Sequence, residues 1–188
     1  MGKAATTSVA ILLATVLAVS ATGKEPGAAE RSRCGKAGQP PVKLTKRQMQ
    51  TSMLCLVNRA RERRGIRRLR FHRALRRAAT GHSKYMVRFN SLSHVGRGGS
   101  TFSSRITRSG YLRGATSYRL AENIGAGNGT FGSPRGVFRL WLKSPPHRRN
   151  MFDGRMRDFG VGVARGNPFG GTGPNAATYT LDMGITRG

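Results

Sequence analysis

The order of the periodic segments constrains the fold of this chain more than any other feature. Apolar residues recur at spacings of three and four over residues 46–64 and again over 73–89, which predicts two amphipathic helices. Two strand-like runs, 159–164 and 177–183, come only in the last third, joined by residues 165–175 as a wide hairpin connection. Long helices first and strands late favour an α+β sandwich over a doubly wound parallel sheet.

Local signals mark where the elements of the first two thirds begin and end. Thr45 followed by Gln48 has the pattern of a capping box at the start of the first helix, and Gly65 is placed to end that helix. A shorter helix is expected over residues 100–109. Residues 118–124 alternate enough to form a strand.

A further helix is framed by proline on both sides. Ser133 and Pro134 are typical of an N-cap and first helical position. Pro145 and Pro146 are expected to end this helix and to place His147 in a rigid turn.

The N-terminus has the pattern of a secretion signal. Lys3 precedes the apolar run 9–19, whose eleven residues are fewer than the roughly 20 that span a bilayer as a helix. We therefore expect a signal peptide over residues 1–21, a flexible linker over 22–43, and a single domain over 44–188 of a secreted, extracellular protein. The alternative is an uncleaved membrane anchor; a lipid-anchored form is not expected, because no cysteine lies at the cleavage junction.

Cys34 and Cys55 are the only two cysteines. In an oxidising compartment an even pair favours one disulfide, which would stabilise the fold by roughly 3 kcal/mol in the chain-entropy model. The alternative is a buried apolar Cys55 with Cys34 as a free thiol.

The net charge of +27 is large for 188 residues. Such a charge attracts polyanions: nucleic acid, anionic lipid headgroups or anionic wall polymers. A coding bias toward arginine would give the same composition without any function. The densest run, residues 59–77, has ten arginines but few aromatic residues, so nucleic acid is not expected as the specific partner; a solvated helix face is the other interpretation.

The stretch 120–150 concentrates unusual residues. It contains Glu122, the only acidic residue between positions 63 and 152, together with the single tryptophan, Trp141, and one of four histidines, His147. A lone carboxylate and a histidine among arginines indicate a site. The alternative is that Glu122 pairs with a surface arginine.

Two further histidines have different expected environments. His82 shares the apolar face of the helix over 73–89 and is expected to be a structural core residue, as is Trp141 on the buried face of its own helix. His94 follows the end of the helix over 73–89, where a side chain can overhang a cleft.

Taken in order, short motifs of this chain resemble the CAP superfamily (cysteine-rich secretory proteins, antigen five, pathogenesis-related proteins; the SCP domain), in its short bacterial branch. The resemblance covers about residues 54–184. It implies a three-layer α-β-α sandwich with a central antiparallel sheet. The motifs that carry it are Leu56-Val57-Asn58, Ala78-Ala79, His82-Ser83, Ser93-His94, Gly110-Tyr111, Ala121-Glu122-Asn123-Ile124, Trp141, Ser144-Pro145-Pro146-His147-Arg148-Arg149-Asn150 and Gly160-Val161-Gly162.

The family's cavity is built from two histidines and two glutamates. By resemblance, His94 and His147 are the histidines and Glu122 is the first glutamate, with Asn123 beside it. Ser144 stands where the second glutamate normally falls, so this chain departs from the full set. Two imidazoles and one carboxylate can bind a divalent ion such as zinc. Neither pair of these ligands along the chain, however, has a recognised short metal-binding spacing.

Three functions remain open from the sequence, and the chain is not firmly assigned as an enzyme. The first is a secreted binding module whose cleft takes a lipid, glycan or peptide at an anionic surface. The second is a metal-dependent secreted hydrolase, in which His147 would act as base or metal ligand. The third is a basic polyanion-binding protein whose polar cluster is purely structural. Oligomeric state is not indicated.

Overall fold

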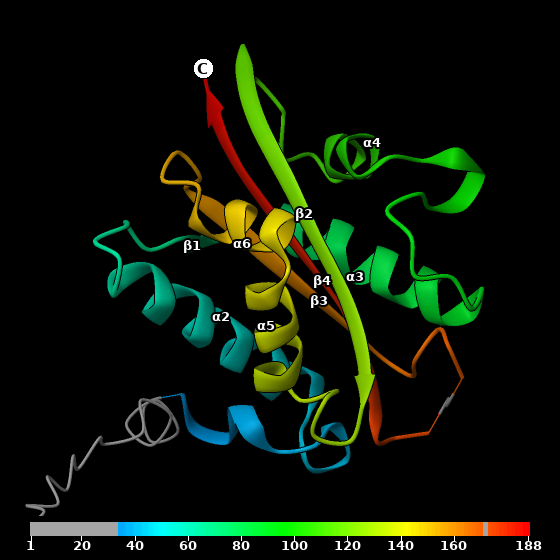
Figure 1. Cartoon of the computed structure of the whole chain (residues 1–188). Helices are drawn as coiled ribbons and strands as arrows, with labels where there is room; N and C mark the ends of the chain where they lie inside the picture. The colour runs from blue at the N-terminus through cyan, green and yellow to red at the C-terminus, as the bar shows by residue number, and fades with distance from the viewer. Residues whose placement is uncertain (1–33, 171–172) are drawn as a thin grey trace, which may run out of the picture.

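A four-stranded sheet forms the middle layer of the computed structural model, which describes residues 34–170 and 173–188 (Figure 1). Its order is β1-β3-β4-β2, and both long pairings, β3 with β4 and β4 with β2, are antiparallel. The two-residue β1 adds a short parallel edge beside β3. The expected central antiparallel sheet is therefore confirmed, with one small parallel addition. The strands are β1 (Arg70–Phe71), β2 (Ser117–Asn128), β3 (Asp158–Arg165) and β4 (Ala176–Arg187).

Helices cover both faces of this sheet (Figure 1). One face packs against α3 (Arg73–Arg88), which is joined by α4 (Phe102–Arg108). The other face packs against α2 (Lys46–Glu62), α5 (Pro134–Lys143) and α6 (Pro145–Phe152). The three-layer α-β-α sandwich is thus confirmed.

Capping explains where the helices begin. Thr45 Oγ1 accepts from the Gln48 amide at 3.1 Å, while Gln48 Oε1 accepts from the Thr45 amide at 2.8 Å, which is the expected capping box. Gly65 follows α2 with φ +66°, a conformation that glycine adopts without strain. Ser133 caps α5 through the Gly136 amide, with Pro134 at the first position.

Side chains alternate across the strands and give the two faces different chemistry. Val161 and Val163 of β3, with Leu181 of β4, face α2 and α5 in the main hydrophobic core. Trp141 fills the same core and donates its indole N–H to the Ile124 carbonyl at 2.8 Å. The intervening residues of β4 face α3 and are polar: Thr178, Thr180 and Asp182.

Glycine allows α3 to lie directly on the sheet. A Cβ at Gly160 would collide with the backbone of Leu75 and Arg76, and one at Gly162 would collide with the backbone of Ala79. The Gly-Val-Gly motif therefore combines a bare surface toward α3 with a valine toward the opposite core.

The structure corrects the expected turn at Pro145 and Pro146. These residues occupy the first positions of α6, where proline costs little because the first amides of a helix have no intrahelical acceptor. The break lies one residue earlier, at Ser144, which has extended backbone (φ −89°, ψ 115°) and separates α5 from α6. His147 consequently lies inside a helix.

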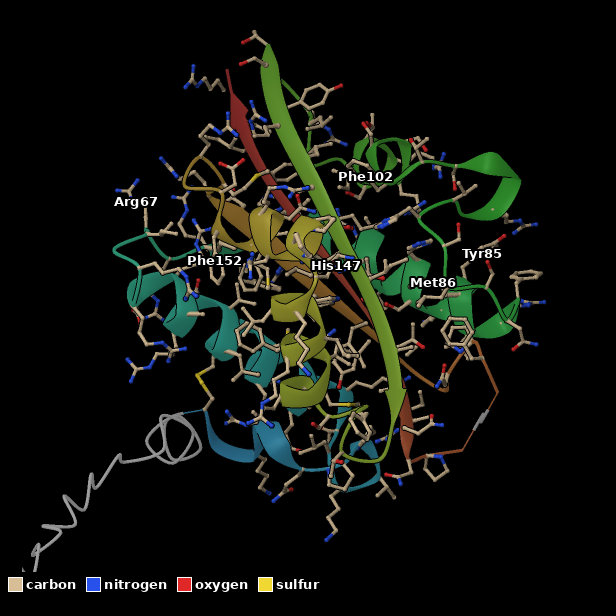
Figure 2. The ribbon with its side chains drawn as sticks, viewed as in Figure 1. Arg67, Tyr85, Met86, Phe102, His147 and Phe152 are labelled. Atoms are coloured by element: carbon tan, nitrogen blue, oxygen red, sulfur yellow. A yellow bond between two sulfur atoms is a disulfide. The ribbon has the colours of Figure 1, made fainter. Side chains whose placement is uncertain are left out.

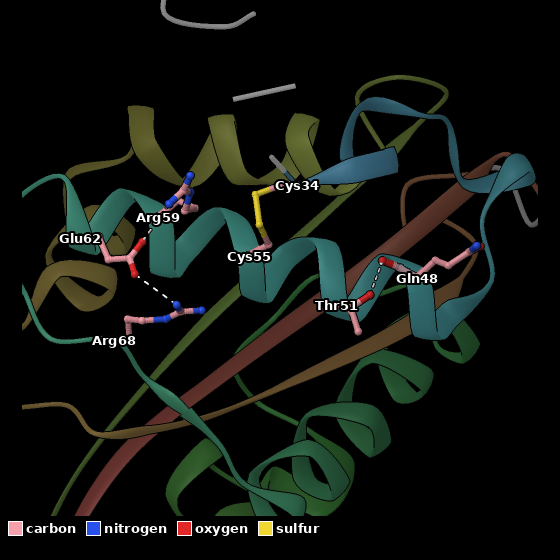
Figure 3. Close-up of a disulfide and its surroundings, with 7 residues drawn as sticks. All are labelled: Cys34, Gln48, Thr51, Cys55, Arg59, Glu62 and Arg68. Atoms are coloured by element: carbon pink, nitrogen blue, oxygen red, sulfur yellow. Dashed lines mark hydrogen bonds and ion pairs between the residues drawn. A yellow bond between two sulfur atoms is a disulfide. The ribbon is translucent and has the colours of Figure 1, made fainter. Parts of the chain in front are cut away.

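The disulfide between Cys34 and Cys55 is present, with a Cα–Cα distance of 5.6 Å (Figure 3). It ties the described N-terminal end to α2. The flexible linker expected over 22–43 is wrong for residues 34–43, which form two 3-10 helices, η1 (Gly35–Gly38) and η2 (Pro41–Lys43). Ala37 is fully buried in the core, and Arg165 donates to the carbonyl of Pro41. These contacts order the segment.

Residues 22–33 of that linker and the expected signal peptide lie outside the described residues. Among the residues that the structure describes, none of the helices is long and apolar enough to cross a membrane.

Candidate functional site

Glu122 is the centre of a buried polar cluster on the α3 side of the sheet. Its side chain, carried by β2, has no exposed surface. One carboxylate oxygen lies 2.8 Å from His94 Nδ1, and the other accepts from Arg105 Nη2 at 2.7 Å. Burial would raise the pKa of Glu122, but the hydrogen bond from His94 and the charge and hydrogen bond of Arg105 outweigh burial and hold it below its ordinary value. Both oxygens of an ionised carboxylate are therefore occupied.

Arg105 connects Glu122 to the loop that carries His94. It projects from α4, and its Nη1 donates to the carbonyls of His94 at 3.0 Å and Ser100 at 2.8 Å. One guanidinium thus fixes both the carboxylate and the backbone of the loop. The sequence analysis did not single out Arg105, because nothing local distinguishes it from the other arginines.

His94 is the exposed member of the cluster. Half of its side-chain surface is accessible, in contrast to that of Glu122. Nδ1 faces the Glu122 carboxylate, so Nε2 lies on the opposite side of the ring and points away from it. The loop is thereby built to present one imidazole nitrogen.

Asp182 is a second buried carboxyl that the sequence analysis missed. It is the cross-strand neighbour of Glu122 and is fully buried. Burial, followed by the charge of Glu122, raises its pKa well above the ordinary value, so the protonated acid hydrogen-bonded to Glu122 is favoured. Its Oδ1 has no hydrogen-bond partner among the described residues. The sequence feature that could have identified Asp182 is its alternation with Thr178 and Thr180, which places all three side chains on one polar face of β4.

His82, on α3, holds the same loop in place. It is buried on α3, and its Nε2 lies 2.8 Å from the Ser93 carbonyl, one residue before His94. Burial lowers its pKa, although the charge of Glu122 opposes this, so the ring is neutral with Nε2–H donating to Ser93. Its Nδ1 is buried without a partner in the described part of the chain.

His147 approaches the same strand from the other side. It lies on α6, which packs against β2 (Figure 2), and its carbonyl accepts from Asn123 Nδ2 at 3.0 Å. Asn150 donates to Asn123 Oδ1 at 2.9 Å and to the Glu122 carbonyl at 3.3 Å, which fixes α6 on β2. Burial and then the nearby charge of His94 lower the pKa of His147. The two histidines therefore interact electrostatically across the edge strand β2, but no hydrogen bond joins their rings among the described residues.

The predicted zinc ligands do not converge. Within residues 34–170 and 173–188 no group of three or more His, Cys, Asp or Glu side chains is arranged to hold a metal ion. Glu122 uses both oxygens on His94 and Arg105, and Asp182 is held as the acid. The arrangement does not fit a zinc site. The Ser144 hydroxyl makes no capping hydrogen bond to α6.

Solved structures with the same fold come from bacterial proteins. An extracellular protein containing an SCP domain from Bacillus anthracis is 25% identical, with a TM-score of 0.60 over 77% of this chain and 44% of that one. An outer surface protein of Borrelia burgdorferi is 14% identical, with a TM-score of 0.63 over 77% of this chain and 97% of its own. A cysteine-rich secretory protein from Staphylococcus aureus is 15% identical, with a TM-score of 0.54 over 75% of this chain and 39% of that one. The chain therefore spans less than half of the Bacillus and Staphylococcus proteins.

The sequence itself decides the family. No curated protein sequence matches the chain. The sequence model of the cysteine-rich secretory protein family, CAP, matches residues 54–180, which is more than half of the 188 residues. The match contains His94, Glu122 and His147. The chain belongs to the cysteine-rich secretory protein (CAP) family.

Proposed function

We propose that this chain is an extracellular CAP-domain binding module. The proposed cleft comprises His94, Asn123, Ser144 and His147 beside the edge strand β2, and it would take a lipid, glycan or peptide through a polar group. Its positive charge holds the module to an anionic surface. The Bacillus relative is described as extracellular and the Borrelia relative as an outer surface protein, which supports this location.

One observation carries the proposal: Glu122 is buried with both oxygens paired, while His94 is half exposed. A carboxylate in this state is not free to act as a base or nucleophile toward a ligand. The Glu122 carboxylate instead fixes the orientation of the His94 ring, and it leaves Nε2 available to bind the ligand. Pre-ordering of a binding group lowers the entropic cost of association.

The metal-dependent hydrolase is the less supported alternative. In the described part of the chain no hydroxyl or thiol is hydrogen-bonded to the imidazole of His94 or His147, and the metal ligands do not converge. Calorimetric titration with zinc compares the mature wild-type protein with His94→Ala. A heat of binding that His94→Ala abolishes would restore this alternative.

Native mass spectrometry of the protein recovered from the culture medium tests the binding module. We expect an additional mass on the wild-type protein that His94→Ala loses. Val95→Ala is the matched control, because Val95 is the adjacent residue, is also exposed, and has an apolar side chain that cannot hydrogen-bond to Glu122. No added mass on the wild type, or an added mass that His94→Ala retains, would contradict the proposal and leave the cluster as structural.

A further inference from the structure

Five arginines line one open hollow on the α6 side of the molecule. We call this hollow the arginine groove; its volume is about 730 Å³. The arginines come from four separate segments, so the groove is a product of folding and not of one charged run. They are Arg64 after α2, Arg119 on β2, Arg148 and Arg149 on α6, and Arg155 in the turn before β3.

A smaller hollow continues the groove along the ends of β2 and β4. It shares Arg119 and Arg155 and adds Arg187, with a volume of about 220 Å³. Arg187 pairs in register with Ser117, two residues from Arg119. The cationic surface is therefore elongated, from the end of α2 across α6 to the last strand.

The positive charge in the groove is scarcely neutralised from within. Asp153 is the one acidic residue that lines it, and Arg155 occupies both of its carboxylate oxygens at 2.9 Å. The side chains of Arg119, Arg148 and Arg149 make no hydrogen bond or ion pair to any described residue, although the charge of Arg119 contributes to a lowered pKa of Asp153 after the hydrogen bonds of Arg155. Gathering like charges costs free energy, and an external anion removes that cost.

Guanidinium groups are well suited to binding phosphate. The planar fork of arginine donates two parallel N–H bonds to a phosphate or carboxylate, and it remains charged at every physiological pH. An elongated row of such groups fits a linear partner that repeats its anions along the chain, because each phosphate bound releases counterions and adds to the affinity.

The distribution of exposed apolar residues argues against two other anionic partners, a lipid membrane and single-stranded nucleic acid. Of the large apolar side chains exposed in the described part, only Tyr118 lies in either hollow. Phe152 lines the groove but is covered by the Arg64 guanidinium, 4.0 Å from the ring centre. Apart from Tyr118 in the smaller hollow, the surface therefore has neither the apolar anchor of a membrane-inserting surface nor a row of aromatic rings on which successive bases could stack.

We propose that the arginine groove binds a linear polymer of phosphate diesters without bases, of the kind that carries negative charge in a cell wall. The inference rests on the proposed function for its extracellular setting, and it names the anionic surface partner. α6 links the two sites: Asn150 bonds the backbone of Glu122, while Arg148 and Arg149 face the groove. Polymer binding would thus bring the cleft to the surface that carries the polymer.

Titration of the folded, disulfide-intact protein with synthetic poly(glycerol phosphate) over a salt series tests this inference. The test variant is Arg148→Ser/Arg149→Ser. The control is Arg47→Ser/Arg73→Ser, which removes the same charge from exposed arginines lining a different hollow. We expect the test variant to bind at least about 10-fold more weakly, with the salt slope reduced by about 1.4 for two lost phosphate contacts. The control is expected to change affinity less than about 2-fold.

Three results would overturn the inference. Equal weakening in the two double variants would show a diffuse attraction by net charge. Tighter binding to a DNA oligonucleotide of equal phosphate number would assign the groove to nucleic acid, and binding to anionic vesicles but not to the soluble polymer would assign it to membranes. His94→Ala separates this inference from the proposed function: it should retain full polymer affinity. If the wild-type protein carries no cleft ligand, or if His94→Ala retains that ligand, while polymer binding stays intact, the result counts against the proposed cleft alone.

Discussion

Two polar regions lie at β2 and are built in opposite ways. The cluster around Glu122 contains two carboxyl groups, one guanidinium and two imidazoles, and its charged oxygens are all engaged. The arginine groove contains five guanidiniums and one carboxylate, and three of those guanidiniums lack a partner in the described part of the chain. Burial accounts for the difference, because a buried charge must be paired whereas an exposed one is solvated by water. Pairing therefore marks the cluster as part of the fold, whereas the solvated arginines of the groove are available to an external anion.

The largest effect is expected from breaking the pairing of Glu122. Glu122→Gln leaves Arg105 buried with an uncompensated charge, which should lower the free energy of unfolding by about 3–5 kcal/mol. Chemical denaturation measures this loss. Glu62→Gln is the control, since Glu62 is paired with Arg59 and Arg68 but is partly exposed (Figure 3); its loss should be below about 1 kcal/mol. Equal small losses would mean that the cluster is not structural.

Asp182→Asn should act in the opposite direction. Because the folded-state pKa of Asp182 is raised, the folded protein binds more protons than the unfolded chain, and this group reduces stability as pH rises above its ordinary value of 3.8. Asparagine cannot ionise and can still donate to Glu122. We expect a melting temperature a few degrees higher at pH 7, with the gain shrinking toward pH 4. A variant less stable than the wild type at pH 7 would contradict the protonated state.

Glu122 and Asp182 also show what the sequence can and cannot predict. Glu122 stood out because it is isolated among arginines and lies in the Glu-Asn-Ile motif of the CAP resemblance. Asp182 and Arg105 meet it only through strand register and the packing of α4, which no local pattern encodes. The α+β class was predictable because periodicity and caps agree with one another, whereas the three-layer α-β-α arrangement was an implication of the CAP resemblance.

The errors of the sequence analysis have similar causes. Pro145 and Pro146 were interpreted as a helix end, but proline is equally suited to a first helical turn, and only packing on β2 distinguishes the two. Residues 34–43 looked like a linker because their composition is polar and rich in glycine and proline; the disulfide and the burial of Ala37 order them. Net charge predicted a polyanion partner, but not the convergence of four segments in one groove.

A smaller effect is expected at His82, on the acidic side of neutrality. Its pKa is lowered, so below its ordinary value of 6.5 the unfolded chain binds a proton that the folded protein resists. Stability should therefore fall from pH 7 to pH 5. His82→Gln retains a donor for the Ser93 carbonyl and does not titrate. Between pH 7 and pH 5 the melting temperature of this variant should therefore fall by a few degrees less than that of the wild type. His147 also has a lowered pKa but is less buried, so His147→Gln should remove a smaller part of the pH dependence.

The smallest effect on stability is expected from the groove itself. Arg148→Ser/Arg149→Ser removes two exposed guanidiniums that have no partner among the described residues, so the free energy of unfolding should change by no more than about 0.5 kcal/mol. We expect a slight increase in the free energy of unfolding, because the variant removes repulsion between like charges. Added salt should diminish this increase by screening the same charges. Thermal unfolding at low and high salt measures both. A loss comparable to that of Glu122→Gln would show that the arginines are held by contacts within the fold, and it would remove the contrast on which the groove is assigned to an external partner.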